Sequence, residues 1–320
     1  MGSEQEIIFR HKSVLLDEVL EQLNIREDGI YVDGTLGGAG HAGEVCKRLK
    51  GGRFVGIDQD ADAIAVATER LAKYPFAQVV RSNYSEMRKV LTELGIEKVS
   101  GILLDLGVSS YQLDTAERGF SYMEEEAPLD MRMDRTKGIT AAEYVNTVTE
   151  QEFVRILREY GDEKWAVRIA QMLMEKRAEK PLETTFDLVK VVDAAIPKAV
   201  RRKDEGHPAR RTFQAVRIAV NDELAPLEQA IRDWVDMLRP GGKLCVITFH
   251  SVEDRIVKNT FRSLQNPCTC PPKAPICICG KKPLGRATGG AIKAGKSELS
   301  DNSRSHSATL RVFVKGENHA

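Results

Sequence analysis

Two acidic residues, Asp33 and Asp58, lie at positions from which they could bind a nucleoside. Asp33 ends a short apolar run and opens the segment Asp33-Gly-Thr-Leu-Gly-Gly-Ala-Gly-His41, and Asp58 ends the next apolar run. Glycines let a backbone approach a ligand closely and adopt positive φ angles. A carboxylate at a strand end can accept hydrogen bonds from the two hydroxyls of a ribose. The two features together predict a nucleoside-binding loop.

The chemistry of the loop distinguishes between two cofactors. Gly38-x-Gly40-x-x-Gly43 matches the dinucleotide fingerprint literally, but such a match alone is weak. In a nicotinamide enzyme the first glycine comes at the strand end, whereas Asp33 takes that place here. An acid there suits a ligand with an ammonium group and no pyrophosphate, such as S-adenosylmethionine. The loop therefore favours a methyltransferase over a nicotinamide-dependent oxidoreductase, and over a turn that only packs a helix on a strand.

A second polar motif, Asp105-Leu-Gly-Val-Ser-Ser-Tyr-Gln112, follows a later apolar run. Amino-group methyltransferases carry a short polar motif at this place, where it meets both the cofactor and the target amine. We therefore expect Asp105 to be catalytic. His250 is a second candidate for the amine contact, although a lone histidine could equally be structural. The segment Ser251-Val-Glu-Asp254 is more typical of a helix cap than of catalysis.

The elements that must position these residues alternate between strand and helix. We expect buried strands at 30–33, 54–58, 77–80, 101–105 and 243–249, a final strand at 307–314, and helices at 41–49, 61–72, 87–94, 213–238 and 252–264. Continuous Val/Ile/Leu runs are typical of strands covered on both faces. The alternation predicts an α/β fold with a Rossmann-like, doubly wound parallel sheet.

The rhythm changes in the middle of the chain. From Thr140 to Pro197 the pattern is helical only, and Thr140-Ala-Ala-Glu143 and Thr149-Glu-Gln-Glu152 have the form of capping boxes. We expect an inserted all-helical domain over 113–211, which would recognise the substrate. The sheet domain is then discontinuous, over 1–112 and 212–320.

Charge and hydropathy limit the classes of protein. Lys plus Arg and Asp plus Glu both total 47, which argues against non-specific coating of nucleic acid. The basic residues are nevertheless clustered, because 255–297 holds no acid and a second basic run comprises Lys198, Arg201, Arg202, Lys203, Arg210 and Arg211. These runs are either solvated loops or surfaces that contact phosphate. No stretch has the roughly 20 apolar residues of a membrane helix, and residues 1–12 lack a signal peptide, so we expect a cytoplasmic protein without membrane contact.

Four of the six cysteines form the pairs Cys268-Thr-Cys270 and Cys277-Ile-Cys279. They could bind zinc, but Cys-x₂-Cys is the commoner spacing. A cytosolic disulfide is not expected. We therefore predict no metal site and leave the role of the four thiols open, while Cys46 and Cys245 are expected in the core.

The chain closely resembles the ribosomal RNA small subunit methyltransferase H family, also called the MraW family. The motifs that carry the resemblance run in order across nearly the whole chain: His11-Lys-Ser-Val-Leu-Leu-Asp-Glu18, 33–41, 101–110, Glu117-Arg-Gly-Phe-Ser121, Pro128-Leu-Asp-Met-Arg-Met-Asp134, Arg211-Thr-Phe-Gln-Ala-Val-Arg217 and Phe249-His-Ser-Val-Glu-Asp-Arg255. The resemblance implies a class I methyltransferase that uses S-adenosylmethionine. It also implies N4-methylation of a cytidine in the decoding region of small-subunit (16S) rRNA, either free or in the assembled subunit.

The resemblance also implies the residues that contact the cofactor. By position these are Ala39, Gly40, His41, Asp58, Tyr84, Asp105 and Gln112. Ala39 replaces a glycine that is often found in the family, which a backbone contact should tolerate. Tyr84 could stack on the adenine, or could be a half-buried cover residue.

Other functions remain open at this point. A non-catalytic RNA or ribosome-assembly factor could keep the same fold, although the intact loop with Asp58 and Asp105 argues against it. A DNA or small-molecule methyltransferase is also possible, because no base-reading residue is apparent. The oligomeric state is not predicted.

Overall fold

The computed structural model describes residues 13–124, 126–201, 206–271 and 276–317. Several residues of the sequence predictions lie outside this part of the chain: His11 and Lys12 of the first motif, and Arg202, Lys203 and Lys273 of the basic runs. None of the helices in the described part is long and apolar enough to cross a membrane.

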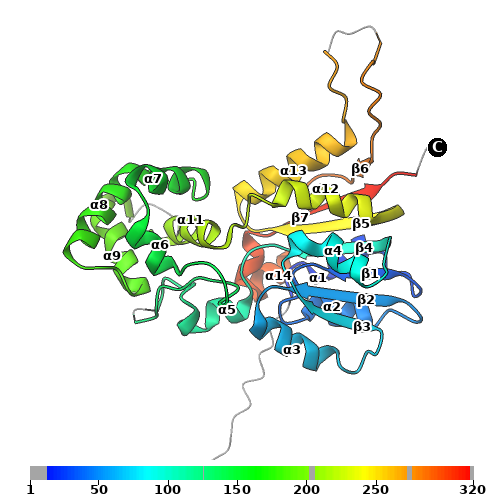
Figure 1. Cartoon of the computed structure of the whole chain (residues 1–320), viewed down its shortest axis with the longest axis horizontal. Coiled ribbons are helices and arrows are strands. Elements are labelled where there is room, and N and C mark those ends of the chain that lie inside the picture. Colours follow the sequence, from blue (N-terminus) through cyan, green and yellow to red (C-terminus); the bar gives the residue numbers. More distant parts are fainter. Residues whose placement is uncertain (1–12, 125, 202–205, 272–275, 318–320) are drawn as a thin grey trace, which may run out of the picture. The chain divides into compact units, whose positions relative to one another are not determined.

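A seven-stranded sheet forms the frame of the first part of the molecule (Figure 1). Its order is β3-β2-β1-β4-β5-β7-β6. The strands are β1 Ile30–Asp33, β2 Arg53–Asp58, β3 Ala77–Arg81, β4 Val99–Asp105, β5 Leu238–Thr248, β6 Gly285–Ala287 and β7 Thr309–Lys315. The first five are parallel, and β7 runs antiparallel between β5 and β6. This confirms the predicted α/β fold and parallel sheet.

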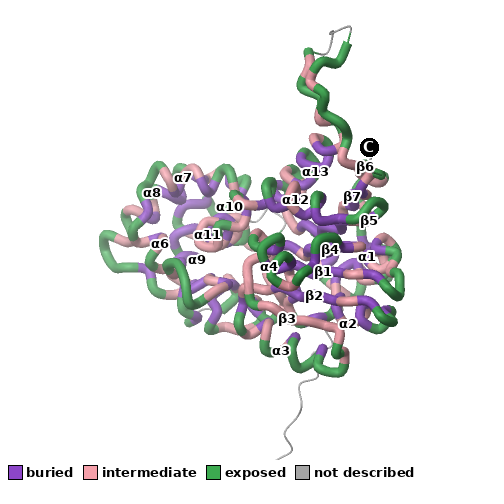
Figure 2. Tube along the Cα trace, turned by 45° about the vertical axis from the view of Figure 1, so that its right-hand side comes forward, coloured by how far each residue is buried: buried purple, intermediate pink, exposed green. Residues whose placement is uncertain are grey.

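Apolar side chains on both faces hold the sheet to its helices. On one face, residues of β1, β2, β4 and β7 share a buried cluster with α1 Leu16–Leu23, α2 Gly40–Cys46 and α3 Ala61–Leu71. Leu310 and Val312 of β7 belong to this cluster. Phe313, on the opposite face of the same strand, packs against Phe261 of α13, Ser251–Gln265. The remaining helical segments here are η1 Tyr84–Glu86, α4 Met87–Glu93, α12 Leu227–Met237, α14 Lys296–Asp301 and η3 Ser303–His306. The central strands are therefore buried along most of their length (Figure 2).

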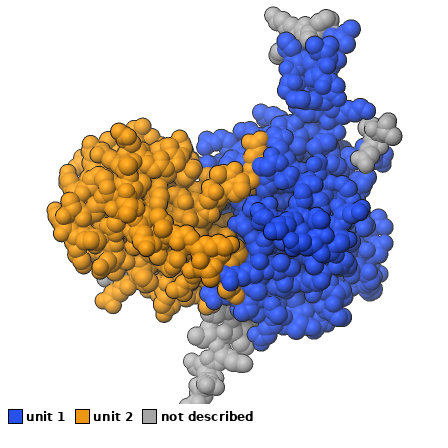
Figure 3. Space-filling model, viewed as in Figure 1, with its two compact units in different colours: residues 1–58, 62–106, 229–320 blue, residues 59–61, 107–228 orange. Residues whose placement is uncertain are grey.

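The chain divides into two compact units (Figure 3). Unit 1 comprises residues 1–58, 62–106 and 229–320, and contains the sheet. Unit 2 comprises 59–61 and 107–228. Its helical segments are α5 Ser110–Asp114, η2 Ala116–Arg118, α6 Ala141–Thr147, α7 Glu150–Glu159, α8 Ala166–Glu179, α9 Thr185–Ala195, α10 Lys198–Arg201 and α11 Arg210–Asn221.

Capping and apolar packing explain the helices of unit 2. Thr140 accepts a hydrogen bond from the Glu143 N–H while Glu143 accepts one from the Thr140 N–H, a reciprocal capping box. Thr149 caps α7 through the Glu152 N–H. The helices bury one apolar cluster, to which α11 contributes Phe213 and Val216. This packing groups α11 with unit 2, whereas the sequence analysis placed most of it in the sheet domain.

Two predictions about local structure were wrong. The single helix expected over 213–238 is two helices. The first, α11, ends at Asn221 because its C-cap Asp222 is left-handed with a φ of 48°, and Pro226 precedes α12. The strand expected from Lys243 begins at Leu238 instead, and residues 239–242 form an irregularity in its pairing with β4.

A buried ion pair fixes the start of unit 2. Arg118 Nη2 lies 2.7 Å from Asp60 Oδ2, and these side chains are 2% and 4% exposed. Arg118 also donates to the carbonyl oxygens of Arg132 and Met133. Gln112 Nε2 donates to the same Asp60 oxygen at 2.7 Å. The pair thus joins residues 59–61, which follow β2, to segments far along the chain.

Replacing Arg118→Met should lower the free energy of unfolding of unit 2 by about 3–5 kcal/mol, because it leaves Asp60 charged and buried without its cation. Urea unfolding followed by Trp165 fluorescence, in a Trp234→Phe background, would measure the loss. The control is Arg135→Met, which removes an arginine that is 54% exposed beside Asp130, and should cost less than about 1 kcal/mol. Equal losses in the two variants would contradict the importance of the buried pair.

Candidate functional site

The loop between β1 and α2 is tied to both neighbouring strands. The Gly34 N–H donates to the Leu103 carbonyl of β4 at 3.0 Å, and the Leu36 N–H donates to the Ile57 carbonyl of β2 at 2.9 Å. The Leu36 side chain is buried in the apolar cluster under the sheet. The loop is therefore fixed at the carboxyl edge of the parallel strands, where open α/β sheets bind their ligands.

Ala39 adopts a left-handed conformation at the start of α2, with φ 60° and ψ 30°. Such a conformation costs an L-residue about 1–2 kcal/mol, which glycine avoids. The Ala39 methyl group is 4% exposed, so its burial offsets part of that cost. The backbone angle gives the physical reason why a glycine also suits this position. Next to it, a Cβ on Gly40 would meet the Ser13 hydroxyl, so a larger residue there would require the Ser13 side chain to move.

Asp58 supports the loop from the end of β2. Its Oδ2 accepts a hydrogen bond from the Gly37 N–H at 2.8 Å, and Gly37 itself has a positive φ of 49°. The carboxylate therefore fixes the turn that the sequence analysis assigned to the ligand. Its predicted contact with a ribose stays a prediction.

Thr35 connects the carboxylate of Asp33 with the backbone of Asp105. Asp33 is 3% exposed, and its Oδ1 accepts hydrogen bonds from the Thr35 N–H at 3.0 Å and the Thr35 hydroxyl at 3.4 Å. The Thr35 hydroxyl oxygen in turn accepts the Asp105 N–H at 2.6 Å. Burial raises the pKa of Asp33 to about 7, and the charge of Asp58 adds to the effect. Thr35 was not among the predicted site residues, although it lies within the loop motif.

Asp105 has an unsatisfied oxygen atom. Its side chain is 28% exposed, yet Oδ1 is buried and has no hydrogen-bond partner among the described residues. Burial raises the pKa of this carboxyl to about 8, and the negative charges of Asp33 and Glu253 contribute. A buried acceptor without a donor is costly. The site therefore favours a ligand that brings a cation or an N–H group to Asp105.

The His41 ring lies next to Asp105 and is neutral. Its Nε2 is 3.0 Å from the Val14 carbonyl oxygen, which assigns the proton to Nε2, and burial lowers its pKa to about 4. Nδ1 lies 3.9 Å from Asp105 Oδ2, which is too far for a hydrogen bond. The His41 side chain is thus part of the support around Asp105.

Glu298, close to the C-terminal end of the sequence, binds the segment around Leu15 that His41 contacts. Glu298 Oε1 accepts hydrogen bonds from the Leu15 N–H, at 2.8 Å, and from the Ser305 hydroxyl. The Glu298 side chain is buried with these bonds in place. Sequence reasoning missed this residue, because nothing in its local sequence marks it as a contact of a segment 283 positions away.

Gln112 and Tyr84 have other contacts than those predicted. Gln112 belongs to unit 2, where its amide accepts the Ser109 N–H at 2.9 Å and donates to Asp60. Tyr84 is half-buried, and its ring meets Trp234 edge-on at 5.6 Å between centroids. This contact favours the cover role for Tyr84. The cofactor contacts of both residues stay predictions.

His250 caps a helix. It is the N-cap of α13, and its Nδ1 accepts the Glu253 N–H at 3.4 Å, while its Nε2 lies 2.9 Å from Glu253 Oε1 without the geometry of a hydrogen bond. Glu253 also accepts the Phe249 N–H at 3.0 Å. The interpretation of Ser251 as the start of the cap was wrong by one residue. These bonds favour the structural role of His250.

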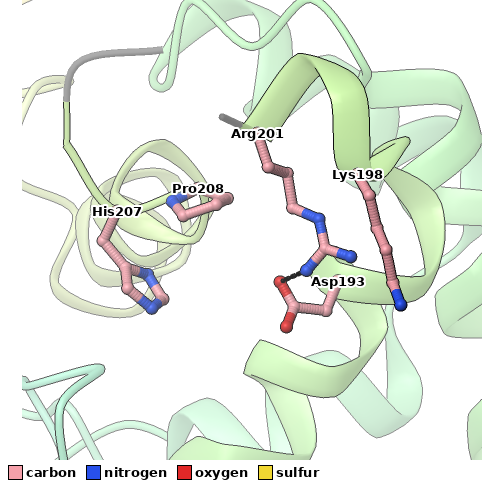
Figure 4. Close-up of a pocket in the computed structure, with 5 residues that line it drawn as sticks. All are labelled: Asp193, Lys198, Arg201, His207 and Pro208. Carbon is pink, nitrogen blue, oxygen red and sulfur yellow. Dashed lines mark ion pairs between the residues drawn. The ribbon is translucent and has the colours of Figure 1, made fainter. Parts of the chain in front are cut away.

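Part of the second basic run surrounds a hollow of about 410 Å³ in unit 2 (Figure 4). Lys198, Arg201, His207 and Pro208 line it together with Asp193. Arg201 Nη1 pairs with Asp193 Oδ1 at 2.7 Å, and Lys198 is exposed. The hollow is therefore lined by two basic side chains, an imidazole and one carboxylate, and the carboxylate is paired with Arg201.

Comparisons with known proteins agree with this geometry. The model of the MraW methylase family matches residues 8–316. A protein of Lachnospira eligens named ribosomal RNA small subunit methyltransferase H is 57% identical over 310 residues, covering 96% of this chain and 98% of that protein. A protein of the same name from Symbiobacterium thermophilum is 52% identical over 312 residues, covering 96% of this chain and 97% of the other.

Solved structures show a weaker similarity. An rRNA methylase from Streptococcus thermophilus has a TM-score of 0.40 at 10% identity, and covers 94% of each chain. Precorrin-6y C5,15-methyltransferase from Geobacter metallireducens has a TM-score of 0.43 at 7% identity, covering 99% of this chain and 94% of that one.

The raised pKa of Asp105 predicts how stability depends on pH. The folded chain keeps a proton on this carboxyl that the unfolded chain releases near pH 4, so its contribution to stability is lost as pH rises toward about 8. The unfolding free energy should fall between about pH 5 and pH 8, and Asp105→Asn should reduce that fall because the amide does not titrate. Thermal unfolding across this pH range would measure the slope. Asp301→Asn, at an exposed position, is the control, and identical slopes in both variants would refute the assignment.

Proposed function

Because the chain belongs to the MraW methylase family, we propose that it methylates N4 of a cytidine in the decoding region of small-subunit ribosomal RNA. The observation that carries the catalytic part of the proposal is the buried, unpartnered Oδ1 of Asp105. The names of the relatives support the RNA target.

Family membership confirms the predicted enzyme class, a methyltransferase, with S-adenosylmethionine as its cofactor. When bound, the cofactor supplies an electrophilic methyl group on a sulfonium. The chain's own residues fit this group. Asp33 and Asp105 are carboxyls that burial disfavours as anions, and a cationic ligand restores their charged forms. The turn at Gly37 and Gly40 exposes backbone without side chains beside them.

The N4 amine of the cytosine must above all be positioned correctly relative to the methyl group. The lone pair of a cytosine N4 is delocalised into the ring, so methyl transfer requires an in-line approach and an acceptor for the N4 proton. Asp105 Oδ1 accepts an N4–H, orients the amine, and takes the proton as the methylated amine forms. Asp33 holds the backbone N–H of Asp105 through Thr35, and the neutral ring of His41 packs beside the Asp105 carboxyl.

The RNA is recognised in part by its phosphates. The hollow of unit 2 brings Lys198 and His207 to one surface, beside the ion pair of Arg201 with Asp193. Cations of this kind fix the position of an RNA backbone without reading its sequence. An enzyme that acts on ribosomal RNA, free or in assembled small subunits, would work in the cytoplasm, as the sequence predicts.

Transfer of a labelled methyl group to small subunits that lack base methylation, followed by nucleoside analysis, tests the proposal. We expect N4-methylcytidine. Asp105→Asn should lower kcat about 10²-fold or more, because the amide cannot take the proton. Asp58→Ala should act mainly on KM for S-adenosylmethionine, and Asp301→Asn is the control.

The same assay with free RNA and with DNA separates the alternatives. Label in DNA but in neither RNA preparation would overturn the RNA target. Cofactor binding without transfer to any of these substrates would favour a non-catalytic role. Full activity of Asp105→Asn would refute the assignment of the proton acceptor.

Lys198→Glu should weaken RNA binding and reduce the slope of log affinity against log salt by about one, since one phosphate contact is lost. Affinity for S-adenosylmethionine should not change. Binding titrations at several salt concentrations would measure both. Lys180→Glu makes the same charge change at another exposed lysine of unit 2, where we expect little effect. Equal losses in the two variants would show only a general effect of charge.

A further inference from the structure

An exposed arm connects α13 to β6 in unit 1 (Figures 1 and 2). Its base is fixed: the Leu284 N–H donates to the Leu264 carbonyl at 2.9 Å, and the Ala287 N–H donates to Gln265 Oε1 at 2.9 Å. Beyond the base, the described part of the arm has no apolar core, and Ile276 and Ile278 are 74% and 86% exposed. Packing of side chains therefore does not account for its conformation.

Four thiols meet on this arm. Cys268 and Cys270 lie on the outgoing limb, and Cys277 and Cys279 on the returning limb. Their Sγ atoms all lie within 4.8 Å of one another. The separations are 3.6 Å from Cys268 to Cys277, 3.8 Å from Cys270 to Cys277, 3.5 Å from Cys277 to Cys279 and 3.8 Å from Cys279 to Cys268.

Four of the six sulfur–sulfur separations match those of four ligands around one tetrahedral ion, and the other two do not exceed 4.8 Å. A regular tetrahedron with Zn–S bonds of about 2.3 Å places its sulfur atoms about 3.8 Å apart. A tetrahedral set of four sulfur ligands is typical of Zn²⁺ or iron. Four thiolates within 4.8 Å of one another leave room at their centre for one ion. The arrangement also includes an N–H donor to sulfur, from Ile278 to Cys270 Sγ at 3.3 Å.

The charges of the arm complement such a centre. Four thiolates around one divalent cation carry a net charge of about −2. The sequence from 255 to 297 holds no acid, and Lys281 and Lys282 follow Cys279 after one glycine. The negative charge of a metal centre in this segment would therefore be balanced by nearby lysines, and no carboxylate of the same segment would repel it.

We propose that Cys268, Cys270, Cys277 and Cys279 bind one structural Zn²⁺ that fastens the two limbs of the arm together. Binding releases the thiol protons to solvent and forms four Zn–S bonds. This replaces our expectation, from the Cys-x-Cys spacing, that the thiols bind no metal. The ion takes the place of the missing apolar core. The proposal does not depend on the proposed function, because the arm's metal content can be measured without any substrate.

Elemental analysis of the purified full chain, kept reduced, tests the proposal. We expect about one zinc per chain, and after exchange with Co²⁺ the visible absorption of a tetrahedral thiolate site. Cys268→Ser with Cys270→Ser should abolish both signals and speed tryptic cleavage after Lys281, which is followed by Lys282 and not by proline. The melting transition of the sheet should persist, because the described residues of the arm belong to neither of the two apolar clusters named above.

Cys46→Ala and Cys245→Ala are the matched controls, since they remove buried thiols outside the arm and should retain zinc. Failure of the reduced chain to bind zinc, as purified and after reconstitution, would overturn the proposal. Zinc retained by the double serine variant would do the same. Iron in place of zinc, or disulfides among the four cysteines in the reduced protein, would also refute it.

Discussion

The hydrogen bond from the Asp105 N–H to the Thr35 hydroxyl joins the ends of β4 and of the loop that follows β1. The same threonine donates to the Asp33 carboxylate, so the Asp33 side chain and the Asp105 backbone are fixed to one residue. Burial raises the pKa of both carboxyl groups. Such an arrangement lowers the stability of the chain at neutral pH. It persists because the strands that carry it are anchored on both faces by apolar packing, and it prepares a site for a positively charged ligand.

The order of the sheet brings these groups together. β1 pairs with β2 on one side and with β4 on the other, so the parallel strands end at one edge with Asp33, Asp58 and Asp105. The backbone of the glycine loop then bonds to both neighbouring strands, and Asp58 fixes its turn. The residues predicted to bind the ligand therefore also make the loop rigid. Their positions are fixed as well as those of residues within a strand.

The molecule stabilises its parts in three different ways. Unit 1 depends on a sheet that is apolar on both faces, and unit 2 on a helical cluster with a buried pair between Asp60 and Arg118. The arm after α13 has neither, since its described residues are largely exposed and its cysteines converge on one point. A bound ion supplies locally the energy that a core supplies elsewhere.

The sequence by itself determined the elements and the motifs. Continuous apolar runs predicted the five parallel strands, capping signatures at Thr140 and Thr149 predicted helix starts, and the loop with Asp33, Asp58 and Asp105 predicted the class of enzyme. These features are local, so they can be read from neighbouring residues. Only the tertiary structure decided contacts between distant segments: Glu298 with Leu15, Arg118 with Asp60, Thr35 with Asp105, and the four cysteines with one another. No local pattern encodes such contacts, because the packing of the whole chain sets which side chains meet and how far each is buried.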